Sequence, residues 1–223
     1  MQNVVPLEEQ LADRALADRR ETYSAEVRRL LDATFAVTRR TGSLDPQVRD
    51  IVREAGLSNQ AFYRHFSSKD ALMLAVLADG RRQLVAYLAR QIGGAPTPDD
   101  RLRRFVRGIM AQARNIDAAE ATRPFAVNTH RLAARFPTEV AASRTELLDL
   151  IRPAIHDLGG NDRDVEFVHD LAMARMHDAL VQQRKPAPAE VDQLISFCLA
   201  GVERRADASE PGRRNGGSHT DGA

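Results

Sequence analysis

One short stretch of the chain carries side chains of the types that bind nucleic acid. Asn59 and Gln60 bear amides that can pair with adenine edges in the major groove of DNA. The hydroxyl of Tyr63 and the ammonium of Lys69 are ordinary donors to phosphate oxygens. These residue types predict a surface that reads base edges and holds the backbone of a duplex.

The residues around this stretch predict two short helices joined by a tight turn. Asp45 is a good N-cap, and Pro46 suits the first helical position, where its missing N–H is no loss. Gly56 supplies the left-handed residue that ends the first helix, Leu57 is the expected buried plug of the turn, and Ser58 caps the second helix. The expected apolar positions are Val48, Ile51, Val52 and Ala55 in the first helix and Phe62 and Phe66 in the second. The pattern is typical of a helix-turn-helix.

The composition predicts an all-α protein. The 223 residues are 43% hydrophobic and 5% aromatic, lack Trp, and show no strand-like alternation of Val, Ile, Thr and Tyr. The single cysteine, Cys198, excludes an internal disulfide and a Cys-rich zinc site. No apolar run reaches the roughly 18 residues needed to cross a bilayer. The N-terminus lacks the basic-then-apolar order of a signal peptide. We therefore expect a cytoplasmic protein with no membrane partner.

The net charge of +1 is uninformative for the whole chain but not for this region. Between residues 39 and 69, six Lys or Arg face three Asp or Glu, a local excess of three positive charges. That excess fits a duplex reader, although it is also common on ordinary solvated surfaces.

The remaining sequence predicts further helices and four segments. A charged extension over residues 1–22 either lengthens the next helix or stays mobile, with Arg14, Arg19 and Arg20 as a possible DNA-binding arm. A helix-turn-helix domain covers 23–68, a helical ligand-binding and dimerisation body covers 69–205, and 206–223 form a disordered tail. The expected helices are 24–41, 69–93, 98–115, 118–135 with a break at Pro124, 137–158, 162–185 and 189–205. The second of these, roughly 36 Å long, would join the head to the body.

The last two long helices carry more apolar surface than one packed side requires. Phe167, Leu171 and Ala174 form a stripe beside a longer one on the same helix. Small residues allow close approach, so we expect a homodimer through these two helices. The longer stripe comprises Val165, Val168, Ala172, Met176 and Ala179, and the last helix adds Val191, Leu194, Ile195, Cys198, Leu199 and Val202.

Polar groups among apolar residues suggest a small-molecule pocket. His130 lies near Arg123 in such a stretch, where a structural histidine is an equally good interpretation. His169, Met173 and His177 recur every four residues, but no cysteine or carboxylate completes a metal set, so we expect neither a metal nor a cofactor. The candidate ligand-binding residues are Phe105, Met110, Phe125, His130, Phe136, His169 and Met173.

The chain resembles the tetracycline-repressor (TetR) family of transcriptional regulators over about residues 24–75. The resemblance rests on Ile51, Glu54-Ala-Gly-Leu-Ser58, Phe62-Tyr-Arg-His-Phe66 and Ser68-Lys69. It implies a three-helix head, a connecting fourth helix, and a helical body that dimerises and binds an inducer.

By position, the resemblance places Asn59, Gln60 and Ala61 at base edges and Tyr63, His65 and Lys69 at phosphates. Pro46-Gln47 departs from the Thr or Ser that members often place there for phosphate contact, which leaves Gln47 and backbone N–H groups. The full DNA-binding set is Gln47, Arg49, Ser58, Asn59, Gln60, Ala61, Tyr63, Arg64, His65 and Lys69.

These observations predict a ligand-responsive, DNA-binding transcriptional regulator, a repressor released from operator DNA by a small-molecule inducer. The alternative is a helical interaction module of the same fold that does not bind an operator. An enzyme is not expected, because the sequence holds no nucleophile elbow, phosphate-binding glycine loop or His-Glu-x-x-His.

Overall fold

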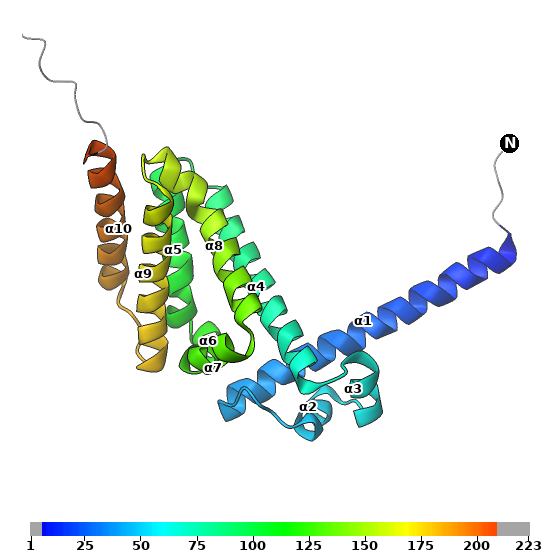
Figure 1. Cartoon of the computed structure of the whole chain (residues 1–223). Coiled ribbons are helices and arrows are strands. Elements are labelled where there is room, and N and C mark those ends of the chain that lie inside the picture. The colour runs from blue at the N-terminus through cyan, green and yellow to red at the C-terminus, as the bar shows by residue number, and fades with distance from the viewer. Residues whose placement is uncertain (1–5, 209–223) are drawn as a thin grey trace, which may run out of the picture. The chain divides into compact units, whose positions relative to one another are not determined.

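The computed structural model describes residues 6–208, and every regular element within that range is an α-helix. The predicted all-α fold with an N-terminal helix-turn-helix is confirmed (Figure 1). None of the helices in these residues is long and apolar enough to cross a membrane. The helices are α1 Leu7–Thr41, α2 Val48–Ala55, α3 Asn59–His65, α4 Lys69–Gly93, α5 Pro98–Arg114, α6 Ile116–Val127, α7 Thr129–Arg135, α8 Pro137–Asp157, α9 Asp162–Val181 and α10 Pro188–Ala208.

The chain forms two compact units whose limits differ from the expected domain boundary after residue 68. Of the described residues, 6–81 and 120–139 form the head unit, and 82–119 and 140–208 form the body unit. The beginning of α4 and all of α7 therefore belong with the helix-turn-helix, as does most of α6.

Side-chain contacts explain why these later segments join the head unit. Arg28 of α1 donates to the buried carboxylate of Asp79 of α4 at 2.8 Å. The rings of Phe35 of α1 and Phe125 of α6 lie 5.7 Å apart at a tilt of 55°. Both contacts join residues far apart in sequence, so no local sequence pattern predicts them.

α1 is longer than expected, because it begins at Leu7 rather than near residue 24. Of the two alternatives for the charged extension, the helical one is observed. The helix ends at Thr41 as predicted, where Gly42 adopts φ 68° and donates its N–H to Thr38 at 2.8 Å.

The predicted start of α2 is wrong by two residues. The helix begins at Val48, its N-cap is Gln47, and no side chain caps it. The carboxylate of Asp45 accepts a hydrogen bond from Lys69 Nζ at 2.6 Å instead. A local propensity for capping thus gives way to a charged partner on α4.

The end of α2 is held by an arginine of α1. Gly56 adopts the predicted left-handed conformation, with φ 61°. Arg29 Nε donates to the Ala55 carbonyl at 2.9 Å, and its Nη2 donates to the Gly56 carbonyl at 2.8 Å. These bonds satisfy carbonyls that the helix itself leaves unpaired. Leu57 is only half-buried, so the expectation that it is the buried residue of the turn between α2 and α3 is wrong. Leu44, in the loop before α2, is buried.

Three other boundaries also differ from expectation. The break between α6 and α7 falls at Asn128 rather than Pro124, and the Asn128 amide donates to the Pro124 carbonyl at 2.8 Å. α9 ends at Val181, shortly before Gln183 takes a positive φ of 55°. α10 continues to Ala208, so residues 206–208 of the expected disordered tail are helical, and residues 209–223 lie outside the described residues.

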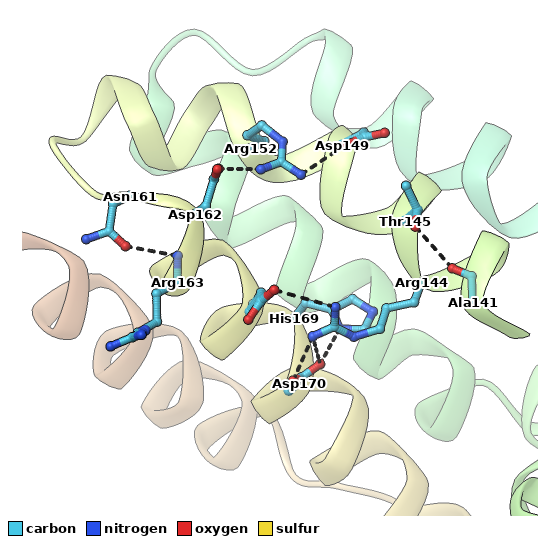
Figure 2. Close-up of polar contacts among 11 residues, drawn as sticks. Ala141, Arg144, Thr145, Asp149, Arg152, Asn161, Asp162, Arg163, His169 and Asp170 are labelled. Carbon is cyan, nitrogen blue, oxygen red and sulfur yellow. Dashed lines mark hydrogen bonds and ion pairs between the residues drawn. The ribbon is translucent and has the colours of Figure 1, made fainter.

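The body unit is built around α5, which packs against α9 and α10. Phe105 and Ile109 of α5 are completely buried. Gly108 lets α5 approach Leu88 closely, because a Cβ there would lie 2.4 Å from the Leu88 Cδ2 atom. α8 and α9 are joined by the ion pair between Arg144 and Asp170 at 3.0 Å (Figure 2).

A carboxylate fixes the connection from α9 to α10. Glu190 accepts two hydrogen bonds from Arg184, at 2.8 and 2.9 Å, and one from Arg175 at 2.8 Å. The Arg184 hydrogen bonds are the main reason that the pKa of Glu190 falls to about 2. The forked geometry of the Arg184 guanidinium makes this a specific link.

The environments of Gly56 and Gly42 predict two different costs of substitution. We expect Gly42→Ala to lower the free energy of unfolding by about 1 kcal/mol, because a Cβ disfavours a positive φ but has open space there. Gly56→Ala should cost about 2 kcal/mol, since its Cβ would also lie 3.0 Å from the Arg29 guanidinium. Urea unfolding of both variants measures the difference, and equal losses would show that the Arg29 guanidinium moves aside for the new methyl group without cost.

Candidate nucleic-acid interface

α3 presents a polar face to solvent. Asn59, Gln60, Tyr63 and Arg64 are all exposed, and Tyr63 is 61% exposed despite its size. The helix starts at the predicted cap, where Ser58 Oγ accepts the N–H of residue 61 at 3.1 Å. The four residues occupy adjacent positions on successive turns of the helix, so their side chains share one outer surface.

The opposite face of α3 is apolar and buried. Phe62 is completely buried and Phe66 is 9% exposed, with their ring centroids 6.1 Å apart. Burial of a phenylalanine of this kind stabilises a fold by roughly 2–3 kcal/mol. Ala61 is also buried, at 6% exposure. Its methyl group therefore packs against the head, and the expectation that it meets base edges needs correction.

The C-terminal end of α3 is attached to α1 through Glu26. The Glu26 carboxylate lies 2.6 Å from His65 Nε2 and accepts a short hydrogen bond from Arg64. The His65 side chain has no exposed surface, and the ring of Tyr23 packs edge-on against it at 4.3 Å. His65 was expected at a phosphate, but its ring is inside the head and supports α3 instead.

Glu26 is the functional residue that sequence reasoning missed. Its side chain is 19% exposed, and the hydrogen bond from His65, followed by that from Arg64, lowers its pKa. The available signal was its position, since Glu26 precedes the buried Leu30 by one helical turn on the same face of α1. A carboxylate on the buried face of a helix indicates a partner on another element.

The remaining candidate DNA contacts lie on both sides of α3. Gln47 is exposed at the start of α2, and Arg49 is 75% exposed and 4.0 Å from Asp50. Lys69, at the start of α4, is 40% exposed and paired with Asp45, whose pKa the Lys69 ammonium lowers. In the free protein this cation therefore already has an acidic partner.

The seven candidate ligand residues divide between the two units. Phe125, His130 and Phe136 belong to the head unit, and the other four belong to the body unit. His130 is exposed, whereas Phe105 and Met110 are completely buried. None of the seven lines the groove of about 1000 Å³ that the head unit contains. Their binding role stays a prediction.

His169 has the most informative environment among these seven. It is 5% exposed, and its Nδ1 lies 2.7 Å from the Asp170 carboxylate (Figure 2). Its buried Nε2 has no hydrogen-bond partner among residues 6–208. The described residues contain no group of three or more His, Cys, Asp or Glu arranged to hold a metal ion.

The fold of the head unit and the polar face of α3 are those of a helix-turn-helix protein. Residues 30–76 match the family described as "Bacterial regulatory proteins, tetR family". The HTH-type transcriptional regulator BetI of Brucella anthropi is 35% identical over 79 residues. That alignment spans 35% of this chain and only 41% of the relative.

Solved structures support the fold over most of the chain. A TetR-family transcriptional regulator from Mesorhizobium loti superimposes with a TM-score of 0.65 and 15% identity, over 82% of this chain and 97% of that one. A second, from Streptomyces coelicolor, gives a TM-score of 0.62 and 24% identity, over 82% and 96%. Residues 30–76 thus carry the sequence pattern of the tetR family of bacterial regulatory proteins, and the wider likeness to these solved structures is one of fold.

The environment of Glu26 predicts a pH-dependent contribution to stability. Because its pKa is below the ordinary value of 4.5, the ionised carboxylate stabilises the fold at neutral pH, and the stabilisation is lost as pH falls through the lowered pKa. We expect Glu26→Gln to lower the melting temperature at pH 7, with the gap to wild type closing below pH 4.5. Glu21→Gln, at an exposed position of the same helix, serves as the control. A gap that stays constant down to pH 3 would contradict the assignment.

Proposed function

We propose that this protein is a transcriptional regulator that binds operator DNA as a homodimer and responds to a small molecule. The observation that carries the proposal is the outer face of α3, where two amides and a tyrosine hydroxyl stand exposed on a buried phenylalanine base. The match of residues 30–76 to the tetR family supports it.

In this proposal the exposed residues divide into two classes of contact. Asn59 and Gln60 pair with base edges in the major groove. Tyr63, Lys69 and Gln47 hold phosphates, and helix N-termini add backbone N–H donors. Arg49 and Arg64 supply further positive charge at the phosphates, Ser58 caps α3, and Ala61 and His65 position it.

The two classes of contact predict different mutant behaviour. Lys69→Ala should weaken binding to all duplexes and reduce the salt slope by about one unit, since one phosphate contact is lost. Gln60→Ala should cost roughly 1–3 kcal/mol at one base position and leave non-specific binding almost unchanged. Asp45→Asn should strengthen binding to all duplexes, because it frees the Lys69 ammonium from its pair.

The measurement uses a duplex selected by the wild-type chain from a random library, with a scrambled duplex as control. Binding is titrated at several salt concentrations. Equal losses on both duplexes for Gln60→Ala would refute base reading by this residue. If the wild-type chain selects no duplex, the proposed function fails and the interaction-module alternative is favoured.

The surfaces of α9 and α10 change which residues we propose for the dimer contact. The longer apolar stripe of α9, which includes Ala172, is buried within the protomer itself. A charge at Ala172 would therefore disrupt the body rather than test the dimer. Phe167 of α9 is 56% exposed and Phe197 of α10 is 69% exposed. We propose that these two rings meet their counterparts across an isologous interface.

Phe197 therefore provides a sharper test of the dimer. We expect Phe197→Asp to yield folded monomers that lose at least about tenfold in operator affinity, because a palindromic site then binds only one head at a time. Ile116→Asp, at a position 71% exposed on α6, is the matched control. Sedimentation velocity gives the mass. A dimeric Phe197→Asp protein, or a monomeric wild type at micromolar concentration, would disprove this interface.

The proposed ligand site in the body unit centres on His169. A buried ring nitrogen without a protein partner is costly, so a ligand that donates to or accepts from Nε2 would be favoured there. Met173 follows His169 by one turn of α9, while Phe105 and Met110 lie on α5, which packs against α9. Mass spectrometry of small molecules released from the purified protein would identify such a ligand.

A further inference from the structure

The N-terminal part of α1, residues 7–22, carries apolar side chains that the rest of the described chain leaves exposed. We term this segment the α1 extension. Every residue in it is exposed, and Leu11 and Leu16 are 58% and 62% exposed. The α1 extension runs beyond α2 and α3 of the same unit (Figure 1). Helices in proteins gain most of their stability by packing an apolar face, so these leucines indicate a partner.

The apolar residues of the α1 extension share one face of the helix. Two alanines form the middle of this face, two leucines form its edges, and at about 100° per residue the four span roughly 140°. Glu8 lies on the same face one turn before the alanines, and Arg19 lies on it one turn after them. The face therefore has a negative charge at one end and a positive charge at the other. In order around the helix, the apolar residues are Leu11, Ala15, Ala12 and Leu16.

The charges of the α1 extension favour a second copy of the chain over DNA as the partner. Residues 7–22 contain five carboxylates and three arginines, an excess of negative charge that disfavours contact with phosphates. No ion pair within residues 6–208 includes Glu8 or Arg19. An antiparallel second copy would bring an Arg19 to each Glu8, so the face is complementary to itself.

Antiparallel pairing about a two-fold axis between positions 13 and 14 covers the leucines and pairs the charges. Ala12 of each helix then meets Ala15 of the other, and such small side chains let the helix axes approach to about 8 Å. Leu11 and Leu16 flank the alanines on both sides. Each Glu8 lies opposite the Arg19 of the second copy, which makes the contact isologous.

We propose that the α1 extension binds the α1 extension of a second copy of this chain as an antiparallel helix pair. Two helices of this length bury less surface than the roughly 1200–2000 Å² of stable complexes. The contact is therefore weak and forms at about 100 μM chain rather than 1 μM. It uses no residue of α9 or α10, so it is a second self-interaction, beyond the proposed function, that joins one dimer to another.

The test is sedimentation velocity of the full chain without DNA, between about 1 and 200 μM. The wild-type chain should associate one step further at the high concentrations than at the low ones. Glu8→Arg and Arg19→Glu should each weaken this step by at least about tenfold, because like charges then face each other in both pairs.

An equimolar mixture of the two variants assigns the effect to antiparallel pairing. In a mixed pair, the substituted position 8 of one chain faces the substituted position 19 of the other with opposite charge, and the second pair is the native one. The association step should therefore return to within about threefold of wild type. Mixing cannot correct a folding defect, so recovery reports the contact itself. Glu21→Arg, the same charge change on the polar face of the α1 extension, should leave association unchanged.

The proposal is overturned if the wild-type chain shows no further association, if Glu8→Arg and Arg19→Glu associate as wild type does, or if their mixture does not recover. It is also overturned if the two variants leave association unchanged but alter duplex binding by dilute chain in opposite directions. In that case the α1 extension contacts DNA instead of a second copy.

Discussion

The orientation of α3 depends on the carboxylate of Glu26. A helix of seven residues is too short to be stable alone, so its place is set by what it packs against. Phe62 and Phe66 hold one face, but an apolar contact permits rotation and sliding. The hydrogen bonds of Glu26 to His65 and Arg64 are directional and fix the end of the helix to α1. Base reading requires this constraint, because an amide must meet a base edge within hydrogen-bond distance.

Two ion pairs, Arg64 with Glu26 and Lys69 with Asp45, reduce the effective positive charge of the head. Arg64 and Lys69 both point at carboxylates in the free protein, so a phosphate must compete with Glu26 or Asp45 for each of them. An exposed ion pair is broken at little cost. The phosphate contact that replaces it nevertheless stabilises binding less than a contact to an unpaired cation would. Under the proposed function, sequence-independent affinity is thereby restrained relative to the base contacts proposed for Asn59 and Gln60. This distribution fits the proposal that an almost neutral chain distinguishes an operator from bulk DNA.

Features encoded within one helical turn could be predicted from the sequence. The Ser58 cap, the left-handed Gly56 and the buried Phe62 depend on neighbouring residues, and all three are confirmed. Features that depend on distant partners could not. Asp45 has the propensity of a cap but finds Lys69, which lies 24 residues away. In the sequence alone, Arg29 and Glu26 cannot be told from ordinary surface charges, because their partners lie at the end of α2 and on α3. The grouping of α6 and α7 with the head has the same origin.

α1 gives the head a mechanical link between α6 and α3. Glu26 and Arg39 lie on one unbroken helix, 13 positions apart, which is roughly 20 Å at 1.5 Å per residue. Leu30 and Val37 anchor this stretch in the core, and it contains no Pro or Gly at which a helix kinks sharply. A displacement of α1 at its contacts with α6 would therefore be carried along the helix to Glu26, and through the hydrogen bonds of Glu26 to the end of α3. The packing of α6 on α1 thus takes part in setting the orientation of α3.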